Sequence, residues 1–345
     1  MAAAGLTSLT AADLAAVPSE VEARLRQART VLTVCHENPE ADALGSALAH
    51  LLIVEALGGR GTAVCVDPVP PMYAFMPAIE RFRQAPDPDL AYDLIVVGDC
   101  GELERIGPLL TDHAELFGRV PILDIDHHRS NRGFGVIDWI DPGAAATCEM
   151  TTLLAARLGV PLDAADGALA ASLVAGLVID TANFQHPNTT PRTLRVGAEL
   201  VAAGAPLYET ARALYRTKPN RQLRLFGRVL ARLEASLDGR LVWSSLEAAD
   251  LAAEGATQAD AEGLSDLLSQ SAGAELVILL KESGAETRLS LRTREGGLDA
   301  TSLAAQWGGG GHARAAGATV PLPLAEARPI VLREAQRLVA ALPPR

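Results

Sequence analysis

Short apolar runs alternate with longer helical patterns through the first half of the chain. Four runs of mostly aliphatic and β-branched residues have the length of buried strands, at residues 31–35, 62–66, 93–97 and 120–125. Helical patterns cover residues 43–57, which end at Gly58 and Gly59, and residues 147–158, 168–177 and 191–203. This alternation is typical of βαβ units, so we expect a parallel sheet covered by helices.

A second set of elements follows a basic and polar stretch at residues 215–224. It comprises predicted strands at 241–244, 276–281 and 287–293 and predicted helices at 225–237, 259–270, 299–306 and 324–342. A chain of 345 residues is longer than one hydrophobic core usually serves. We therefore predict an α/β protein with an N-terminal parallel-sheet domain at residues 1–210, a linker at 211–228 and a smaller α/β C-terminal domain at 229–345.

Composition and cysteine usage point to a globular cytoplasmic protein. Hydrophobic residues make up 49% of the chain and charged residues 21%. The N-terminal stretch lacks the basic and apolar regions of a secretory signal, and no uncharged apolar run reaches the roughly 18 residues of a membrane span. The four cysteines are scattered without a CxxC pair, which argues against disulfides and thiolate zinc sites. The sequence leaves the oligomeric state open, a homodimer included.

The net charge of the chain bears on the kind of nucleic acid or nucleotide that it can bind. At −12, the chain is unlike proteins that bind long nucleic acids through a basic face. A short phosphorylated substrate remains compatible with this charge, because metal ions held by clustered carboxylates supply local positive charge.

Polar residues that can bind metals follow several of the apolar runs. They lie in four segments, at residues 36–46, 97–101, 124–129 and 176–181, each at the end of a predicted strand or just past an apolar run. In open α/β sheets this edge is where ligands bind. We expect four strand ends to bring together eight side chains: His36, Glu40, Asp42, Asp99, Asp126, His127, His128 and Asp180.

Clustered carboxylates repel one another, so a bound cation is the simplest explanation of this set. Oxygen and imidazole ligands without thiolates favour Mn²⁺ before Mg²⁺, and two ions about 3.5–4 Å apart would suit phosphoryl transfer. Taken singly, Asp99 or Asp180 reads better as a turn or N-cap residue. Isolated histidines such as His50 and His113 are more often packed or solvated than metal-binding. The ordered occurrence of all four segments favours the metal site.

The four segments resemble the ordered motifs of the DHH phosphoesterase family, whose third motif is the triplet Asp126-His127-His128. Ser290-Leu291-Arg292 and the segment from Trp307 to Gly317 resemble the phosphate-binding signature of the DHH-associated C-terminal domain. Residues 180–193 are similar to the fourth-motif region of the nanoRNase branch, the bifunctional oligoribonucleases and 3′-phosphoadenosine-5′-phosphate (pAp) phosphatases. The resemblance runs from about residue 31 to residue 320 and so covers nearly the whole chain.

The resemblance implies a role for each motif residue. One metal ion would be bound by His36, Glu40 and Asp99, and the second by Asp42, Asp99, His127 and Asp180. His128 would donate to a phosphate oxygen, and Asp126 would orient a histidine rather than bind metal. Most relatives have aspartate where this chain has Glu40, which changes the reach of that carboxylate.

The glycine run at residues 308–311 has two interpretations. Glycines before a histidine can form a flexible turn. We favour a phosphate-binding loop because cationic side chains flank the run. The residues assigned to phosphate binding are Arg292, Gly309, Gly310, Gly311, His312 and Arg314.

The predicted function is therefore dimetal-dependent hydrolysis of very short oligonucleotides and of pAp, without a covalent enzyme intermediate. A phosphodiesterase acting on cyclic or linear dinucleotides is the main alternative. A DHH-superfamily pyrophosphatase would lack the glycine-histidine loop, and a non-enzymatic nucleotide-binding module would not need the histidine and aspartate set.

Overall fold

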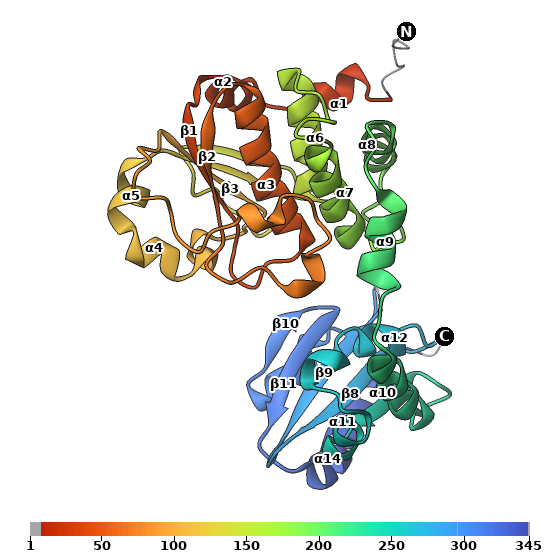
Figure 1. Cartoon of the computed structure of the whole chain (residues 1–345). Helices are drawn as coiled ribbons and strands as arrows, with labels where there is room; N and C mark the ends of the chain where they lie inside the picture. The colour runs from red at the N-terminus through yellow and green to blue at the C-terminus, as the bar shows by residue number, and fades with distance from the viewer. Residues whose placement is uncertain (1–7, 295, 344–345) are drawn as a thin grey trace. The chain divides into compact units, whose positions relative to one another are not determined.

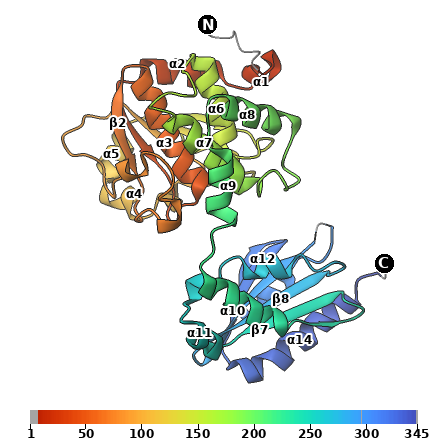
Figure 2. The same ribbon diagram turned by 45° about the vertical axis from the view of Figure 1, so that its right-hand side comes forward.

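Two compact units make up the protein in a computed structural model that describes residues 8–294 and 296–343. The first unit spans Met1–Thr217 and the second Lys218–Arg345. In each unit helices cover a β-sheet (Figures 1 and 2). The interval 211–228, which the sequence suggested as a linker, contains the end of α9 (Leu207–Tyr215) and most of α10 (Asn220–Ala231). No helix in the described ranges is long and apolar enough to span a membrane.

The first unit contains the predicted parallel sheet. Its five strands lie in the order β2-β1-β3-β4-β5, and all neighbouring pairs are parallel. The strands are β1 (Thr30–Val34), β2 (Arg60–Val64), β3 (Leu94–Gly98), β4 (Ile122–Asp126) and β5 (Ile137–Ile140). The first four overlap the predicted strands, and the short edge strand β5 was not predicted.

Both faces of this sheet are covered. Alternate residues of the strands point to opposite sides and pack into two separate cores, as in a parallel sheet buried on both faces. The larger core packs against α3 (Ala41–Ala56), α6 (Thr147–Leu158) and α7 (Ala168–Asp180). The smaller core packs against α4 (Pro108–Asp112) and α5 (Ala114–Arg119), on the other side of the sheet (Figure 1). The other helices are α1 (Ala11–Ala15), α2 (Ser19–Gln27) and α8 (Pro191–Ala202), with short 3₁₀ turns at Pro71–Tyr73, Ile79–Arg81 and Leu103–Ile106.

Two glycines allow α3 and α7 to pack closely. A Cβ atom on Gly45 of α3 would lie 2.5 Å from the carbonyl oxygen of Ser172 on α7. A Cβ atom on Gly176 of α7 would lie 2.3 Å from Oδ1 of Asp42 and 2.5 Å from Sγ of Cys148. Because these distances are below any normal contact, only glycine fits at either position. The close packing holds the end of α7 beside the start of α3.

The second unit is built on a mixed six-stranded sheet in the order β10-β11-β9-β8-β7-β6. Only β7 and β8 are parallel to each other. The strands are β6 (Glu234–Ser236), β7 (Leu241–Leu246), β8 (Leu276–Ser283), β9 (Glu286–Thr293), β10 (Gly310–His312) and β11 (Ala315–Val320). Strands β6, β10 and β11 were not predicted from the sequence.

Helices cover parts of both faces of the second sheet. α14 (Leu324–Ala340) and α13 (Thr301–Ala304) pack on one face, and α10 and α12 (Leu264–Leu268) pack on the other. Figure 2 labels α10, α12 and α14. The remaining helices are α11 (Ala248–Glu254) and the 3₁₀ turns Gln258–Ala261 and Ala305–Trp307.

Two helix predictions in this unit were wrong in extent. The helix expected at 225–237 is α10, which starts earlier because Pro219 forms its N-cap and which ends before β6. The helix expected at 259–270 is split by Gly263, whose φ of +79° is incompatible with a continuous helix.

Candidate active site

Loops that follow neighbouring strands supply four of the predicted site residues. His36 lies just after β1, Asp99 just after β3, and His127 and His128 just after β4. Glu40 and Asp42 lie at the start of α3. Asp180 is the last residue of α7, so the expectation that it follows a strand was wrong. The segment before it is apolar on all sides because α7 is a buried helix, and apolarity alone does not distinguish such a helix from a buried strand.

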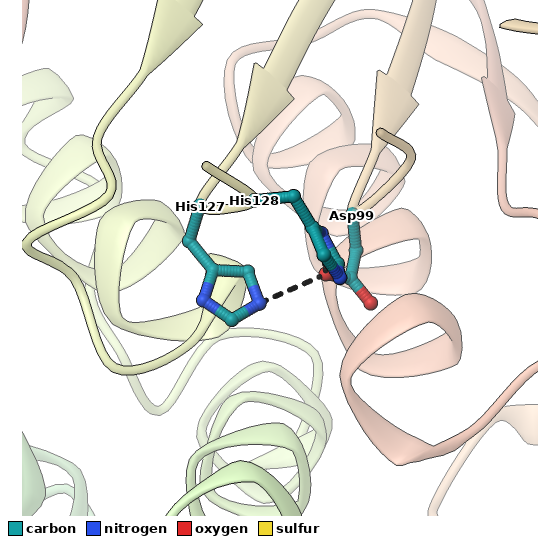
Figure 3. Close-up of side chains that lie close together, drawn as sticks. All are labelled: Asp99, His127 and His128. Atoms are coloured by element: carbon teal, nitrogen blue, oxygen red, sulfur yellow. Dashed lines mark ion pairs between the residues drawn. The ribbon is translucent and has the colours of Figure 1, made fainter. Parts of the chain in front are cut away.

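Asp99 lies at the centre of the cluster. Its Oδ1 forms an ion pair with Nε2 of His127, the dashed line in Figure 3. This oxygen lies 3.4 Å from Nε2 of His127 and 3.6 Å from Nδ1 of His128. Its Oδ2 is 4.0 Å from Nε2 of His36. The side chain is only 2% exposed, and the backbone adopts a left-handed φ of +57°. A non-glycine residue held in this region is a feature of functional sites.

A first group of potential metal ligands consists of His36, Glu40 and Asp99. Nδ1 of His36 lies 2.7 Å from the carbonyl oxygen of Glu37, so this nitrogen carries the proton and donates it. Nε2 of His36 therefore faces the cluster, 3.3 Å from Oε2 of Glu40, where it can donate to that carboxylate or, as neutral imidazole, bind a metal ion. The other oxygen of Glu40 accepts a hydrogen bond from the backbone of Ala43 at 3.1 Å and caps α3.

A second group consists of Asp42, His127 and Asp180, with Nε2 of His127 3.2 Å from Oδ2 of Asp180. The carboxylate of Asp42 accepts hydrogen bonds from the backbone N–H groups of Thr147 at 2.6 Å and Cys148 at 2.9 Å. These are the first two residues of α6. Asp42 thus caps one helix from the first turn of another, which fixes its position at the site.

The remaining pair of predicted residues, Asp126 and His128, interact directly. Oδ1 of Asp126 lies 2.7 Å from Nδ1 of His128 and accepts the backbone N–H of the same histidine at 3.1 Å. Its Oδ2 accepts a hydrogen bond from the side-chain amide of Asn131 at 2.8 Å. A third potential ligand group among the described residues joins Asp99, His127 and His128, and Asp126 belongs to none of the three. Its contacts orient His128, which is more exposed than the other site residues.

The electrostatics of the cluster fit bound cations. Burial raises the pKa of Asp99 well above its usual range, and the charges of neighbouring carboxylates, Asp42 first, add to the rise. Burial and the charge of Asp42 raise the pKa of Asp180 in the same way. Burial acts in this direction on Glu40 too, but hydrogen bonds with His36 and Asp99 lower its pKa to about 2. Divalent cations between these groups would remove the repulsion, so the donor set matches a metal centre.

The predicted phosphate-binding residues all belong to the second unit. His312 pairs with Ala315, which in turn pairs with Arg292, so the side chains of these three residues lie on the same face of the sheet. Nε of Arg292 forms a 2.7 Å ion pair with Oδ1 of Asp266 on α12. The carbonyl of Arg314 accepts the backbone N–H of Thr293 at 3.0 Å, in the turn between β10 and β11.

The glycine run is part of an ordered strand pair rather than a flexible turn. A Cβ atom on Gly309 would lie 2.2 Å from the carbonyl oxygen of Gly317, and one on Gly311 would lie 2.5 Å from that of Ala315. Gly311 also has a φ of +138°. A Cβ atom on Gly310, in contrast, would meet nothing within 4 Å. Two of the glycines are therefore needed so that β10 can approach β11.

Comparisons with known proteins identify the family of this chain. The DHH family, N-terminal domain, matches residues 30–179, and the DHHA1 domain matches residues 241–341. A Thermus thermophilus protein named bifunctional oligoribonuclease and PAP phosphatase NrnA is 32% identical over 83% of this chain and 82% of its own length. The chain belongs to the DHH phosphoesterase family. A Bacillus subtilis protein of the same name is 26% identical to this DHH protein over 84% of the chain and 89% of its own length.

A solved structure supports the fold of the DHH protein. The crystal structure of an exopolyphosphatase-related protein from Bacteroides fragilis superposes with a TM-score of 0.82 at 22% identity, covering 96% of this chain and all of that one. Family membership makes the DHH protein a hydrolytic enzyme, and its histidine and carboxylate groups can bind metal ions.

Sequence reasoning missed several residues that position the site of the DHH protein. Thr147 donates from its backbone to Asp42 and places its hydroxyl 3.2 Å from Oδ1 of Asp99. The amide of Asn131 contacts Asp126 and also Oδ2 of Asp124 at 2.9 Å. No sequence signal identifies these residues, because their roles depend on tertiary contacts. His50 is fully buried and lies 3.0 Å from the hydroxyl of Thr151, in keeping with its interpretation as a packed histidine.

The end of α7, which carries Asp180, is held by side chains from later segments. The hydroxyl of Tyr215 donates to the carbonyl oxygens of Val178 at 3.1 Å and Ile179 at 3.3 Å. The amide of Asn188 donates to the carbonyl oxygen of Asp180 at 3.2 Å. These bonds satisfy the last carbonyl groups of the helix and fix the position of Asp180.

Proposed function

We propose that this DHH protein hydrolyses phosphoester bonds in very short oligonucleotides and in pAp, using two divalent metal ions. The names of the Thermus thermophilus and Bacillus subtilis relatives support the substrate class. The observation that carries the proposal is the set of three overlapping histidine and carboxylate groups, two of which include Asp99. Mn²⁺ is the ion we favour, with Mg²⁺ as the second choice, because the ligands are oxygen and imidazole.

The proposed ligands fall into two sets that share Asp99. The first ion is assigned to His36, Glu40 and Asp99. The second is assigned to Asp42, Asp99, His127 and Asp180. Support comes from the positions of these donors, since the ligand atoms within each three-residue group lie within 4.8 Å of one another.

Two divalent ions, when bound, lower the pKa of water and stabilise negative charge on phosphoryl oxygens. The protein's own part is to hold the ligands in place and to supply a hydrogen-bond donor. Because Nδ1 of His128 is held by Asp126, Nε2 is the nitrogen left to face a substrate oxygen. His128 is therefore proposed to donate to a non-bridging oxygen as charge develops, and Asp126 to orient it.

We assign the two functions to the two units. The first unit performs the chemistry, and the second unit binds a phosphate of the substrate through Arg292, Gly309, Gly310, Gly311, His312 and Arg314. The exposed ion pair between Arg292 and Asp266 is of the kind that contributes little stability, so a phosphate can replace the carboxylate. A cytoplasmic location is part of the proposal and is supported by four free cysteines.

A time course with labelled substrates tests the function. Oligonucleotides of two to ten residues, labelled at the 5′ or the 3′ end, should be shortened in the presence of Mn²⁺, and the shortest should be hydrolysed fastest. The label that is released first identifies the end that is attacked. pAp should release phosphate under the same conditions. If cyclic dinucleotides were turned over much faster than these substrates, the substrate assignment would be wrong.

A variant of the second unit tests the division of labour. His312→Ala should raise KM for pAp and for short 5′-phosphorylated oligonucleotides, and it should leave the metal content unchanged. Loss of one charge-assisted phosphate contact should weaken substrate binding by about 1.5–3 kcal/mol of free energy. A small activated phosphodiester has no remote phosphate for this loop to hold. If kcat/KM fell equally for substrates with and without a remote phosphate, the loop would support the catalytic centre instead.

A further inference from the structure

The face of the second sheet that packs against α12 at the Arg292 end of β9 is open over β11 and the Arg288 end of β9. Leu289 and Leu291 of β9 point into the core beneath α14, whereas Glu286, Arg288, Ser290 and Arg292 point to the other side, with the one acidic residue, Glu286, at the start of the strand. On β11 the residues that share this side are Ala315, Gly317 and Thr319. Arg288, Gly317 and Thr319 are exposed. The open face therefore has a floor of small residues on β11 and arginines along β9.

A lysine on β8 adds a third cation to this face. Lys281 is the direct cross-strand partner of Arg288, and partners in a sheet point to the same side with Cβ atoms about 4.5–5.5 Å apart. Within residues 8–294 and 296–343, neither Lys281 nor Arg288 forms a hydrogen bond or an ion pair through its side chain. Arg292, in contrast, is paired with Asp266.

Two unpaired cations placed opposite each other are unfavourable unless an anion binds between them. Lys281 is half-buried, and burial lowers its pKa, with further contributions from the charges of Arg288 and Arg292. The site is unusual in a protein whose net charge is −12. A phosphate group would remove the repulsion and supply the missing partner for both side chains.

We propose that Lys281 and Arg288 form a second phosphate-binding site, which holds an internal phosphodiester of an oligonucleotide whose terminal phosphate is bound near Arg292 and His312. This inference rests on the proposed function and adds that longer oligonucleotides gain a further phosphate contact. Arg288 is four residues from Arg292 on β9, a separation of about 13 Å along the strand. An oligonucleotide of several residues can reach both positions.

pAp has too few phosphates to use the second site. It carries two, of which one is hydrolysed and the other is assigned to Arg292 and His312. The contribution of Lys281 and Arg288 to substrate affinity should therefore increase with the length of the oligonucleotide.

The test uses the full-length double variant Lys281→Ala/Arg288→Ala. Arg333→Ala is the matched control, because Arg333 is an exposed arginine of the same unit on α14, which packs on the opposite face of the sheet. Binding of a fluorescently labelled, 5′-phosphorylated pentanucleotide is measured by anisotropy in EDTA, so that no hydrolysis is needed. We expect the Kd to rise about tenfold for the double variant and to stay at the wild-type value for the control. The salt dependence of log Kd should become shallower by about 0.7 for each phosphate contact that is lost.

Kinetics with metal ions provide the second readout. The ratio of kcat/KM for the pentanucleotide to kcat/KM for pAp should fall about tenfold in the double variant. The proposal would be overturned if the double variant bound the pentanucleotide with wild-type affinity. It would also be overturned if kcat/KM fell equally for the pentanucleotide and for pAp. Because the binding measurement does not depend on turnover, it remains decisive if the wild-type protein hydrolyses neither substrate. That result would reject the proposed function, while the anisotropy data would still decide whether this face binds phosphates.

Discussion

Gly176 leaves space for the carboxylate of Asp42: a methyl group at Gly176 would lie 2.3 Å from Oδ1 of that residue. Asp42 is in the first turn of α3, and Gly176 is in the last part of α7. The same contact brings Asp180, one helical turn further on, to the site. The absence of a side chain at Gly176 therefore affects both the packing of the two helices and the placement of the proposed ligands.

Gly176→Ala should damage both stability and activity. Forcing a methyl group against Asp42 and Cys148 should cost about 1–3 kcal/mol of unfolding free energy and displace a proposed metal ligand. Denaturant unfolding and metal titration measure the two effects. Gly118→Ala in α5 is the control, because a Cβ atom there meets nothing within 4 Å. That variant should retain wild-type metal affinity, and a Gly176→Ala protein with equally intact affinity would contradict this account of the packing.

Asp99→Asn should eliminate most of the activity while preserving the fold. Asparagine tolerates the left-handed backbone that Asp99 adopts, so the variant isolates the loss of the charge. Turnover should fall by more than about a hundredfold, because substituting even a residue that only supports a metal ligand lowers metal affinity or activity about 10–100-fold. Metal content should fall below two ions per chain. In EDTA, the Tm of the variant should be equal to or higher than that of the wild type, because the replaced carboxylate lies among like charges. Near wild-type turnover with Mn²⁺ would show that Asp99 is not shared between two ions.

Glu40→Asp should stay active but respond differently to Mn²⁺ and Mg²⁺. In the native protein one oxygen of Glu40 caps α3 and the other faces His36. The shorter aspartate is a good N-cap but cannot keep both contacts at the same distances. Activation curves for the two ions measure the difference. Superimposable curves for variant and wild type would remove the reason for regarding Glu40 as a determinant of the first metal site.

The glycines of the β10 segment should differ in their tolerance of substitution. Gly309→Ala and Gly311→Ala should each destabilise the second unit by about 1–3 kcal/mol, because the added methyl group meets the backbone of β11. Gly310→Ala should unfold at the wild-type temperature, since space is open there. Thermal unfolding followed by calorimetry distinguishes the three variants. Equal destabilisation by all of them would mean that the strand pair does not have the described geometry in solution.

The sequence was most informative where apolar runs are long and buried on both sides. Strand β3, for example, is fully buried, and its run of β-branched residues predicted it. Strand β5 escaped prediction because it is short and carries Asp138 at an edge. Strands β10 and β11 are rich in glycine and alanine, which have low strand propensity.

The candidate site was predictable as a set of motifs but not as a structure. The motifs identified His36, Asp99 and His127, which the fold brings close together. They could not identify Thr147 or Asn131, because neither residue type is diagnostic and both act through contacts between distant segments. The helix that carries Asp180 was predicted only to residue 177, and Asp180 was grouped with the strand ends, since a fully apolar segment has no periodicity that would show the helix continuing.

The hydrogen bonds from Tyr215 to α7 determine where the first unit can be separated from the rest of the protein. A fragment that ended at residue 210 would lack Tyr215 and leave the carbonyl groups of Val178 and Ile179 without this donor, next to a proposed metal ligand. A fragment that ends at Thr217 retains the bond and coincides with the boundary between the compact units. Limited proteolysis within residues 216–219, between α9 and α10, is therefore the cut that should release a catalytic fragment with its metal site intact.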